Sequence, residues 1–273
     1  SLFKRGKEVN LVVNYHTLRP LASDEDKAKN FTSRFFANTV QPTSIHYTQN
    51  GDIIVGTALD GVFIFKQDEF GGYTSVPKRI STADKALPSN IIHTLYEDRE
   101  GVVWVGTDRG LATICRDTTY NLGAGPEFKP NWWQRFWGID GPPPLYSGPV
   151  KAITAWGDSI VFASEEHLYK IDAKPEALSS IYEYDIEKHS EEALTNVRQI
   201  LVDLNGEVWI AAEQLLNYSI GEDELRVIGR EQGLRGQGVS TLMEDAEGGY
   251  IWVGTERGGL FRFNNDRYSR IGH

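Results

Sequence analysis

The 273-residue sequence contains one cysteine and one methionine, and no apolar run approaches the length that crosses a bilayer. The single Cys115 excludes an intrachain disulfide and a cysteine-based zinc site, and we expect it to be a small buried apolar residue. A membrane helix needs roughly 20 consecutive apolar residues, and the N-terminal SLFKRGKEVN lacks the apolar core of a signal peptide. We therefore expect membrane attachment only through segments absent from this chain.

Positive charge is also scarce, because 28 Lys+Arg oppose 38 Asp+Glu and give a formal net charge of −10. Nucleic-acid binding needs clustered Lys and Arg to neutralise phosphates, so the acidic balance argues against it. Aromatic residues make up 11% and charged residues 24% of the chain. This composition argues against disorder, and the length allows one large all-β domain or two smaller ones.

Internal repeats dominate the sequence. Two stretches are nearly the same, IIHTLYEDREGVVWVGTDRGL at 91–111 and VSTLMEDAEGGYIWVGTERGGL at 239–260. A partial copy lies at 197–216, and weaker copies start near residues 44 and 150. Positions aligned with the tryptophan of the WVGT step recur at spacings of 50, 57, 48 and 43 residues, at or somewhat above the usual range for propeller blades. These positions are Ile54, Trp104, Val161, Trp209 and Trp252.

Each copy has the same internal order of four expected strands, here called a, b, c and d. A short apolar strand a is followed by a polar turn that ends in Gly or Asp, then by a strand b rich in β-branched and aromatic residues. The b strands show little alternation, so we expect burial on both faces between stacked sheets. The glycine of WVGT is expected to leave room for a bulky aromatic side chain of the neighbouring sheet.

This pattern predicts an all-β protein, a β-propeller of four-stranded blades in a single domain over 1–273. About six blades are expected, or alternatively part of a seven-bladed or larger array. Residues 1–40 fit the pattern least well and form a degenerate unit, an incomplete blade or an N-terminal extension. The chain stops at RYSRIGH, which would complete a fourth strand. The approximate blades are 1–40, 43–80, 90–138, 149–185, 196–229 and 238–272.

The string I-x-x-L-x-E-D-x-x-G-x-x-W-V-G-T-x-x-G-L at 92–111, repeated with one inserted Gly at 239–260, closely resembles the two-component-regulator propeller repeat. The runs ADKALPSNIIHTL and EQGLRGQGVSTL also resemble the linker of that family. The resemblance implies the sensing half of a membrane receptor, on the periplasmic or extracellular side. In that family, notable members are hybrid two-component sensors of gut bacteria that respond to carbohydrate breakdown products, so it also implies carbohydrate sensing.

Catalytic motifs are scarce, with no HExxH, GxSxG or P-loop and with six scattered histidines. The DLNGE stretch at 203–207 superficially suggests a calcium loop, but it lacks further oxygen ligands and is more simply a hairpin turn. We therefore expect no catalytic residue, no metal and no cofactor.

The candidate ligand-binding residues lie on the turns that join strand b to strand c, called here the b–c turns. In a propeller these turns emerge on one face around the central channel. Mixed carboxylates and guanidinium groups on such a rim could hydrogen-bond sugar hydroxyls, although each one alone is more simply an ordinary turn residue. The candidates from these turns are Asp108, Arg109, Glu165, Glu213, Glu256 and Arg257.

The segment NWWQRFWGIDGPPPLYSGP at 131–149 is the most distinctive stretch outside the repeats. Its aromatic residues beside three prolines could form a rigid shelf on which a sugar ring stacks. Packing on a neighbouring strand is the plainer alternative, and a protein contact is a third. Trp137 and Tyr146 complete the set of candidate ligand-binding residues.

Three classes of function therefore stay open. The preferred hypothesis is a non-catalytic sensor that binds a small molecule such as an oligosaccharide over the channel mouth. The first alternative is a scaffold for protein–protein interaction or dimerisation, and a homodimer is left open. The least favoured is a propeller lyase or glycosidase, for which Glu165, Glu166 and His167 would be the acid–base candidates.

Overall fold

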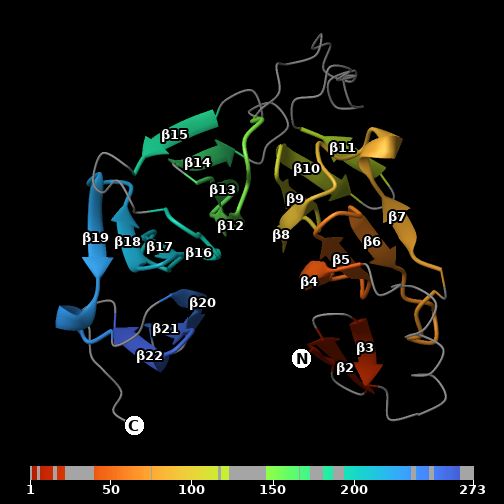
Figure 1. The fold of residues 1–273 in the computed structure, drawn as a ribbon, viewed down its shortest axis with the longest axis horizontal. Coiled ribbons are helices and arrows are strands. Elements are labelled where there is room, and N and C mark those ends of the chain that lie inside the picture. Colours follow the sequence, from red (N-terminus) through yellow and green to blue (C-terminus); the bar gives the residue numbers. More distant parts are fainter. Residues whose placement is uncertain are drawn as a thin grey trace. The chain divides into compact units, whose positions relative to one another are not determined.

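The computed structural model describes residues 2–4, 7–14, 17–21, 40–74, 76–115, 118–122, 146–165, 167–172, 181–186, 194–234, 238–245 and 249–264. It divides into two compact units, Ser1–Asn131 and Trp132–His273. The described elements are strands, apart from two short 3₁₀ helices. Figure 1 shows the sheets to which these strands belong.

The described residues of the first unit form three antiparallel sheets. One has three strands, β1 (Leu2–Lys4), β2 (Lys7–Asn14) and β3 (Thr17–Leu21). The second has β4 (Pro42–Tyr47), β5 (Ile53–Thr57), β6 (Val62–Phe65) and β7 (Lys78–Ile80), followed by the 3₁₀ helix Thr82–Asp84. The third has β8 (Ile92–Glu97), β9 (Val103–Thr107), β10 (Gly110–Cys115) and β11 (Thr118–Asn121).

In the second unit, too, the part of the chain that the structure describes forms three antiparallel sheets. The first has β12 (Ala152–Trp156), β13 (Ser159–Ala163), β14 (His167–Asp172) and β15 (Ile181–Asp185). The next has β16 (Gln199–Val202), β17 (Val208–Ala211), β18 (Leu215–Ser219) and β19 (Glu224–Ile228), followed by the 3₁₀ helix Arg230–Gln232. The last has β20 (Val239–Asp245), β21 (Tyr250–Thr255) and β22 (Gly259–Asn264), and its expected fourth strand, RYSRIG, lies outside the described residues.

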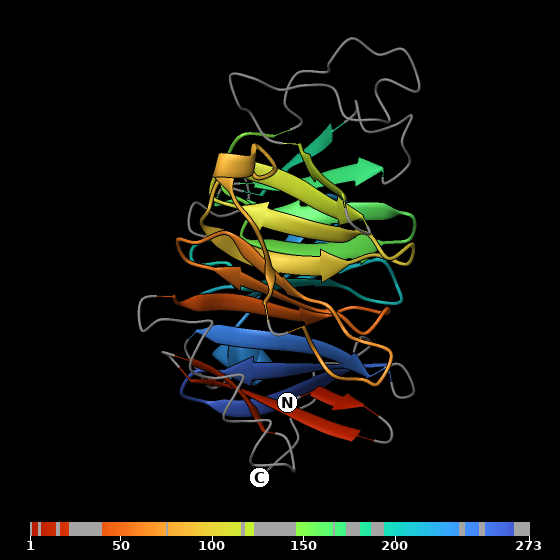
Figure 2. The same cartoon turned by 90° about the vertical axis from the view of Figure 1, so that its right-hand side faces the viewer.

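Strand order within each described sheet follows chain order, so each is a meander of neighbouring antiparallel strands. Figure 2 shows the same strands in a view turned by 90°. The predicted order of strands a to d is thereby confirmed in the four four-stranded sheets. The b strands β5, β9, β13 and β17 are buried at every residue, as expected for strands covered on both faces. Cys115 at the end of β10 is only half-buried, so the expectation of full burial was wrong.

In sheet β4–β7 the glycine of strand b leaves room for the neighbouring sheet, but the side chain that uses this room is aliphatic. A Cβ atom on Gly56 would lie 2.6 Å from Cγ2 of Ile92, which belongs to strand β8 of the next sheet. On Gly254 a Cβ atom would meet Thr241 of the adjacent strand β20 at the same distance. The predicted packing role is therefore confirmed at Gly56, although the partner is aliphatic and not aromatic, whereas at Gly254 the nearest atoms belong to its own sheet.

The aspartate just after strand a organises both the a–b turn and the tryptophan of strand b. Asp203 Oδ1 accepts hydrogen bonds from the backbone N–H groups of Asn205 and Glu207, and its Oδ2 accepts from Trp209 Nε1 at 2.8 Å. Asp98 repeats the pattern, with its Oδ2 2.8 Å from Nε1 of Trp104. The DLNGE stretch is therefore a hairpin turn, as predicted.

The glutamate just before that aspartate links neighbouring sheets. Glu97 accepts a hydrogen bond from the backbone N–H of Gln49, in the a–b turn of the preceding sheet, and Glu244 accepts one from that of Leu204 in the same way. The two residues of the Glu-Asp pair in the repeat thus have different structural roles. The glutamate joins its sheet to the preceding one, and the aspartate closes its own turn.

Candidate ligand-binding site

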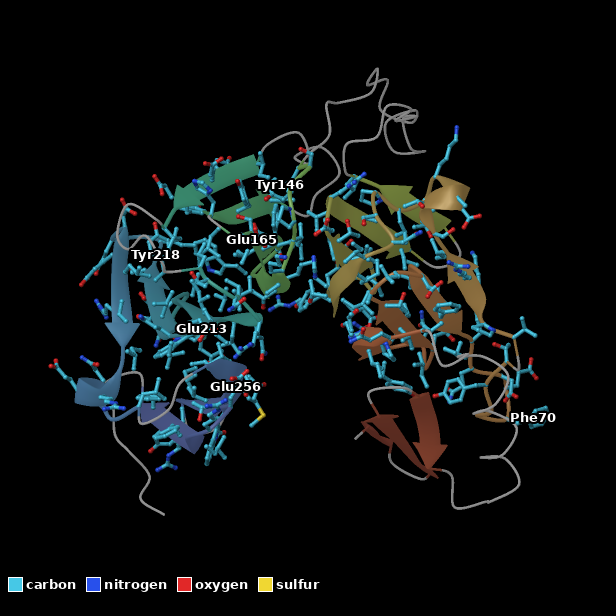
Figure 3. All side chains as sticks on the ribbon, viewed as in Figure 1. Phe70, Tyr146, Glu165, Glu213, Tyr218 and Glu256 are labelled. Carbon is cyan, nitrogen blue, oxygen red and sulfur yellow. The ribbon has the colours of Figure 1, made fainter. Side chains whose placement is uncertain are left out.

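An ion network in the second unit connects two of the predicted b–c turns. Arg198 lies just before β16, and its Nη2 atom is 2.8 Å from Glu256 Oε1 and 3.9 Å from Glu213 Oε1. Its Nη1 donates to the carbonyl oxygen of Val239 at 3.1 Å. Glu213 follows β17 and Glu256 follows β21, and both are labelled in Figure 3. One guanidinium group therefore joins two neighbouring sheets.

The backbone around this network is held in conformations that most residues avoid. Asn196 has a positive φ of 56° and donates from Nδ2 to Glu213 Oε1 at 2.8 Å. Gly238 has a φ of 67°, and a Cβ atom there would lie 2.9 Å from Glu256 Oε2. Asn and Gly adopt left-handed backbone more readily than other residues, so these two positions suit the turns that carry the network.

Other b–c turn carboxylates face a basic residue of strand a or just before it. Glu165 Oε1 lies 2.9 Å from Lys151 Nζ, and Asp108 Oδ1 lies 3.4 Å from His93 Nε2. Sequence reasoning missed these bases and Arg198. A usable signal was present, because each base precedes its carboxylate by 14 or 15 residues: 93 to 108, 151 to 165 and 198 to 213.

The structure brings only some of the predicted residues together. Glu213 and Glu256 share Arg198, while Glu165 pairs with Lys151 within its own sheet. Asp108 and Arg109 lie in the first unit, where Arg109 is exposed and donates its backbone N–H to Thr107 Oγ1. Arg257 is exposed beside Glu256, and Trp137 lies outside the described residues.

Tyr146 packs inside an aromatic cluster of its own unit. Its ring centroid lies 4.7 Å from that of Tyr169 and 5.2 Å from that of Phe162. Its hydroxyl donates to the carbonyl oxygen of Pro149 at 3.5 Å. These contacts give the half-buried tyrosine a packing role, and its contact with a ligand stays a prediction.

The geometry does not support the acid–base group considered for an enzyme. Glu165 turns to Lys151, whereas His167 Nε2 lies 3.3 Å from Glu183 on strand β15. Glu165 and His167 therefore have separate partners, and Glu166 lies outside the described residues. In the described part of the chain, no group of three or more His, Cys, Asp or Glu side chains is placed to hold a metal ion. Among those same residues, no helix has the length and apolar character to cross a membrane.

A family model described as the two-component regulator propeller matches residues 86–109 and 233–257. No curated protein sequence matches the chain. Two similar solved structures are extracellular domains from B. thetaiotaomicron. That of BT3049, named as a hybrid two-component system, has 16% identity over 93% of this chain and 32% of its own, with a TM-score of 0.63. That of BT4673, named as a one-component system, has 18% identity over 86% and 31%, with a TM-score of 0.61.

A streptogramin B lyase structure is also similar, with 14% identity over 82% of this chain and 68% of its own and a TM-score of 0.50. The chain spans about a third of the length of the two extracellular domains. At these identities the likenesses show the fold, an all-β propeller architecture of four-stranded antiparallel sheets. Two of the repeats match the two-component regulator propeller model, so the resemblance read from the sequence is confirmed there.

Proposed function

We propose that the chain is the ligand-sensing propeller of a two-component-type receptor, on the periplasmic or extracellular side of a membrane. Its ligand would be a carbohydrate or a similar polar small molecule held by the b–c turns. The repeat family and the extracellular domains with the same fold support the sensor role. Carboxylates and a guanidinium group at the turns support a hydroxyl-rich ligand, since both kinds of group hydrogen-bond hydroxyls.

The observation that carries the proposal is the sharing of Arg198 between Glu213 and Glu256. These carboxylates come from neighbouring sheets and are about half exposed, with side-chain exposures of 47% and 50%. A ligand that takes over hydrogen bonds of Glu256 would loosen its pair with Arg198 and change the link between the two sheets. Differential contact of this kind is what a ligand needs to shift a conformational equilibrium.

The test is calorimetric screening of the chain with neutral and carboxylated oligosaccharides. Binding by one of them should weaken on the order of tenfold in Glu256→Gln, which keeps the size of the side chain but loses its charge, as expected for a lost charge-assisted hydrogen bond. Glu224→Gln is the matched control, because Glu224 pairs with Arg226 on the outer strand β19, away from the network. Absence of binding by every sugar would remove the carbohydrate part of the proposal. Equal weakening in both variants would remove the site.

A further inference from the structure

Gly238 lies between the two carboxylate residues of the candidate site, and all three belong to the second unit. Its backbone N–H donates to the carbonyl oxygen of Glu213 at 3.2 Å, and its own carbonyl oxygen accepts from the backbone N–H of Glu256 at 2.9 Å. Glu213 and Glu256 stand on the b–c turns of two different sheets. Two hydrogen bonds through one residue therefore connect the backbones of these turns, and hydrogen bonds in such a chain strengthen one another.

Val239, the next residue, begins strand β20 and completes this connection. Its backbone N–H donates to the carbonyl oxygen of Ala212 at 2.8 Å, and its carbonyl oxygen accepts from Arg198 Nη1 at 3.1 Å. We call Arg198 with Glu213 and Glu256 the Arg198 network. Both backbone polar groups of Gly238 and of Val239 are thus bonded to this network or to the turn that carries Glu213.

The turn that carries Glu213 differs from its counterparts in how it is closed. In four other sheets the b–c turn begins with a threonine or serine whose hydroxyl donates to a carbonyl oxygen across the turn. These residues are Thr57, Thr107, Ser164 and Thr255. Sheet β16–β19 has Ala212 in this place, which has no hydroxyl. The bonds from Gly238 and Val239 therefore hold a turn that lacks the hydroxyl of its counterparts.

The absence of a side chain at Gly238 also shapes the network. Its φ is 67°, and a Cβ atom would lie 2.9 Å from Glu256 Oε2 and 3.2 Å from Arg198 Nη1. Both atoms are the ends of flexible side chains, so an added methyl group would displace these side chains before it moved the backbone. The space beside Gly238 is thus used by the two side chains that form the 2.8 Å pair of the site.

From these contacts we infer that Gly238 is a positioning residue of the candidate site, which holds Glu213 and Glu256 at a fixed separation so that they contact a ligand as one unit. Its backbone fixes the two turns relative to each other, and its lack of a side chain lets Glu256 reach Arg198. The contact with a ligand rests on the proposed function, whereas the positioning of the Arg198 network does not. One measurement without a ligand and one with an oligosaccharide test these two parts separately.

Chemical labelling of Arg198 measures the pairing of its guanidinium group without a ligand. Phenylglyoxal reacts with arginine side chains, and mass spectrometry of peptides gives the labelling rate of Arg198 in the full chain. Glu256→Ala removes the carboxylate and should raise this rate about threefold to fivefold, as expected for the loss of an ion pair between partly exposed side chains. Gly238→Ala should raise the rate to the same level, because its methyl group displaces Glu256 from Arg198.

The control variants separate positioning from backbone strain. Gly249→Ala is the matched control, because Gly249 has a φ of 62° but no atom within 4 Å of an added Cβ. Left-handed backbone disfavours alanine at both glycines, so the strain is alike, yet Gly249→Ala should leave the labelling of Arg198 unchanged. Gly238→Asn adds the same Cβ with less strain, because asparagine tolerates this backbone better, and should label as fast as Gly238→Ala.

A double variant shows whether Gly238 acts through Glu256. Gly238→Ala combined with Glu256→Ala should label no faster than Glu256→Ala alone, because the same contact is lost in both. A general loosening of the fold would instead add its effect to that of Glu256→Ala. Each variant is compared at equal ellipticity, so that a misfolded chain is recognised.

An oligosaccharide that binds the chain in calorimetry provides the second measurement. Gly238→Ala should weaken its binding as much as Glu256→Gln does, on the order of tenfold, whereas Gly249→Ala should leave it unchanged. If no oligosaccharide binds, the proposed function fails, and the labelling of Arg198 alone decides whether Gly238 positions the network.

Four results would overturn the inference. The first is unchanged labelling of Arg198 in both Gly238 variants. The second is an equal increase in Gly249→Ala, and the third is an increase from Gly238→Ala that persists when Glu256 is already alanine. The fourth is an oligosaccharide whose binding weakens in Glu256→Gln but not in Gly238→Ala.

Discussion

The hydrogen bond between Asp203 and Trp209 offers a quantitative test of how the repeat is held together. Asp203 is 5% exposed and Trp209 is 1% exposed, so the indole N–H has no access to water if its acceptor is lost. A buried donor left unsatisfied costs about 1–3 kcal/mol. Asp203 also accepts hydrogen bonds from two backbone N–H groups of the turn. This turn has exposed residues, so water can replace the carboxylate there. The indole therefore carries most of the penalty.

Asp203→Asn should lower the free energy of unfolding by about 2–3 kcal/mol, because the amide offers one oxygen for groups that now use two. Trp209→Phe removes the donor but keeps an aromatic ring, at a cost of about 1–2 kcal/mol for the smaller side chain. In the double variant the indole is no longer left unpaired. The double-mutant cycle should then give a coupling of about 1.5–2.5 kcal/mol.

Urea denaturation followed by circular dichroism measures these differences as shifts of the midpoint at constant slope. Asp68→Asn is the matched control. Asp68 likewise accepts hydrogen bonds from two backbone N–H groups of a turn, those of Phe70 and Gly72. Both donor residues are exposed, and the hydrogen bonds described for Asp68 do not include one from an indole. The Asp68→Asn substitution should lower the free energy of unfolding by less than about 1 kcal/mol. Additive effects of Asp203→Asn and Trp209→Phe, within about 0.5 kcal/mol, would refute the reasoning.

Two further predictions concern packing and pH. Gly56→Ala should lower the free energy of unfolding by about 1–3 kcal/mol, because its Cβ would lie 2.6 Å from Ile92 Cγ2. Urea denaturation should show a smaller loss when the same substitution is made in an Ile92→Ala background. Gly221→Ala is the control and should leave the stability unchanged, because the space around Gly221 is open. Burial, with Tyr47 and Asp52 nearby, raises the pKa of Tyr73 to about 12, and burial with the Asp223 hydrogen bond raises that of Tyr218. Since these folded pKa values exceed the unfolded value of about 10, the stabilisation is complete below pH 10 and is lost as the pH rises towards 12. Unfolding free energies between pH 9 and 12 should fall less steeply in Tyr218→Phe, and an equal slope would contradict this assignment.

The strands were predictable because the repeat encodes them several times. The b strands combine β-branched and aromatic residues with little alternation, and the structure buries them on both faces. The choice of Ile92 as the side chain over Gly56 was not predictable, since a glycine reveals that space is needed but not which side chain fills it.

The candidate site was predicted only in part, for a reason that lies in its geometry. The carboxylates of Glu213 and Glu256 were visible as turn residues at equivalent places in the repeat. Their shared partner Arg198 is 15 residues before one and 58 before the other, so its role depends on how two sheets pack. Aligned copies expose positions that recur, and Arg198 occupies a position where other copies have Lys151 or His93. These copies share a basic side chain at this position, but they do not share one residue type.

The same reasoning joins the site to the fold. In this repeat, contacts between sheets are made by groups that also lie at the turns: Glu97 and Glu244 at the a–b turns, and Arg198 near the b–c turns. At the a–b turns the glutamate carboxylates accept hydrogen bonds from backbone N–H groups. The Glu97 side chain is nearly inaccessible to solvent, with an exposure of 4%. The Arg198 contacts are between side chains that are 29% to 50% exposed. Exposed ion pairs contribute little and exchange readily with other polar partners. Under the proposed function, a ligand would act on the sheet-to-sheet link at the b–c turns, while the a–b side holds the sheets in register.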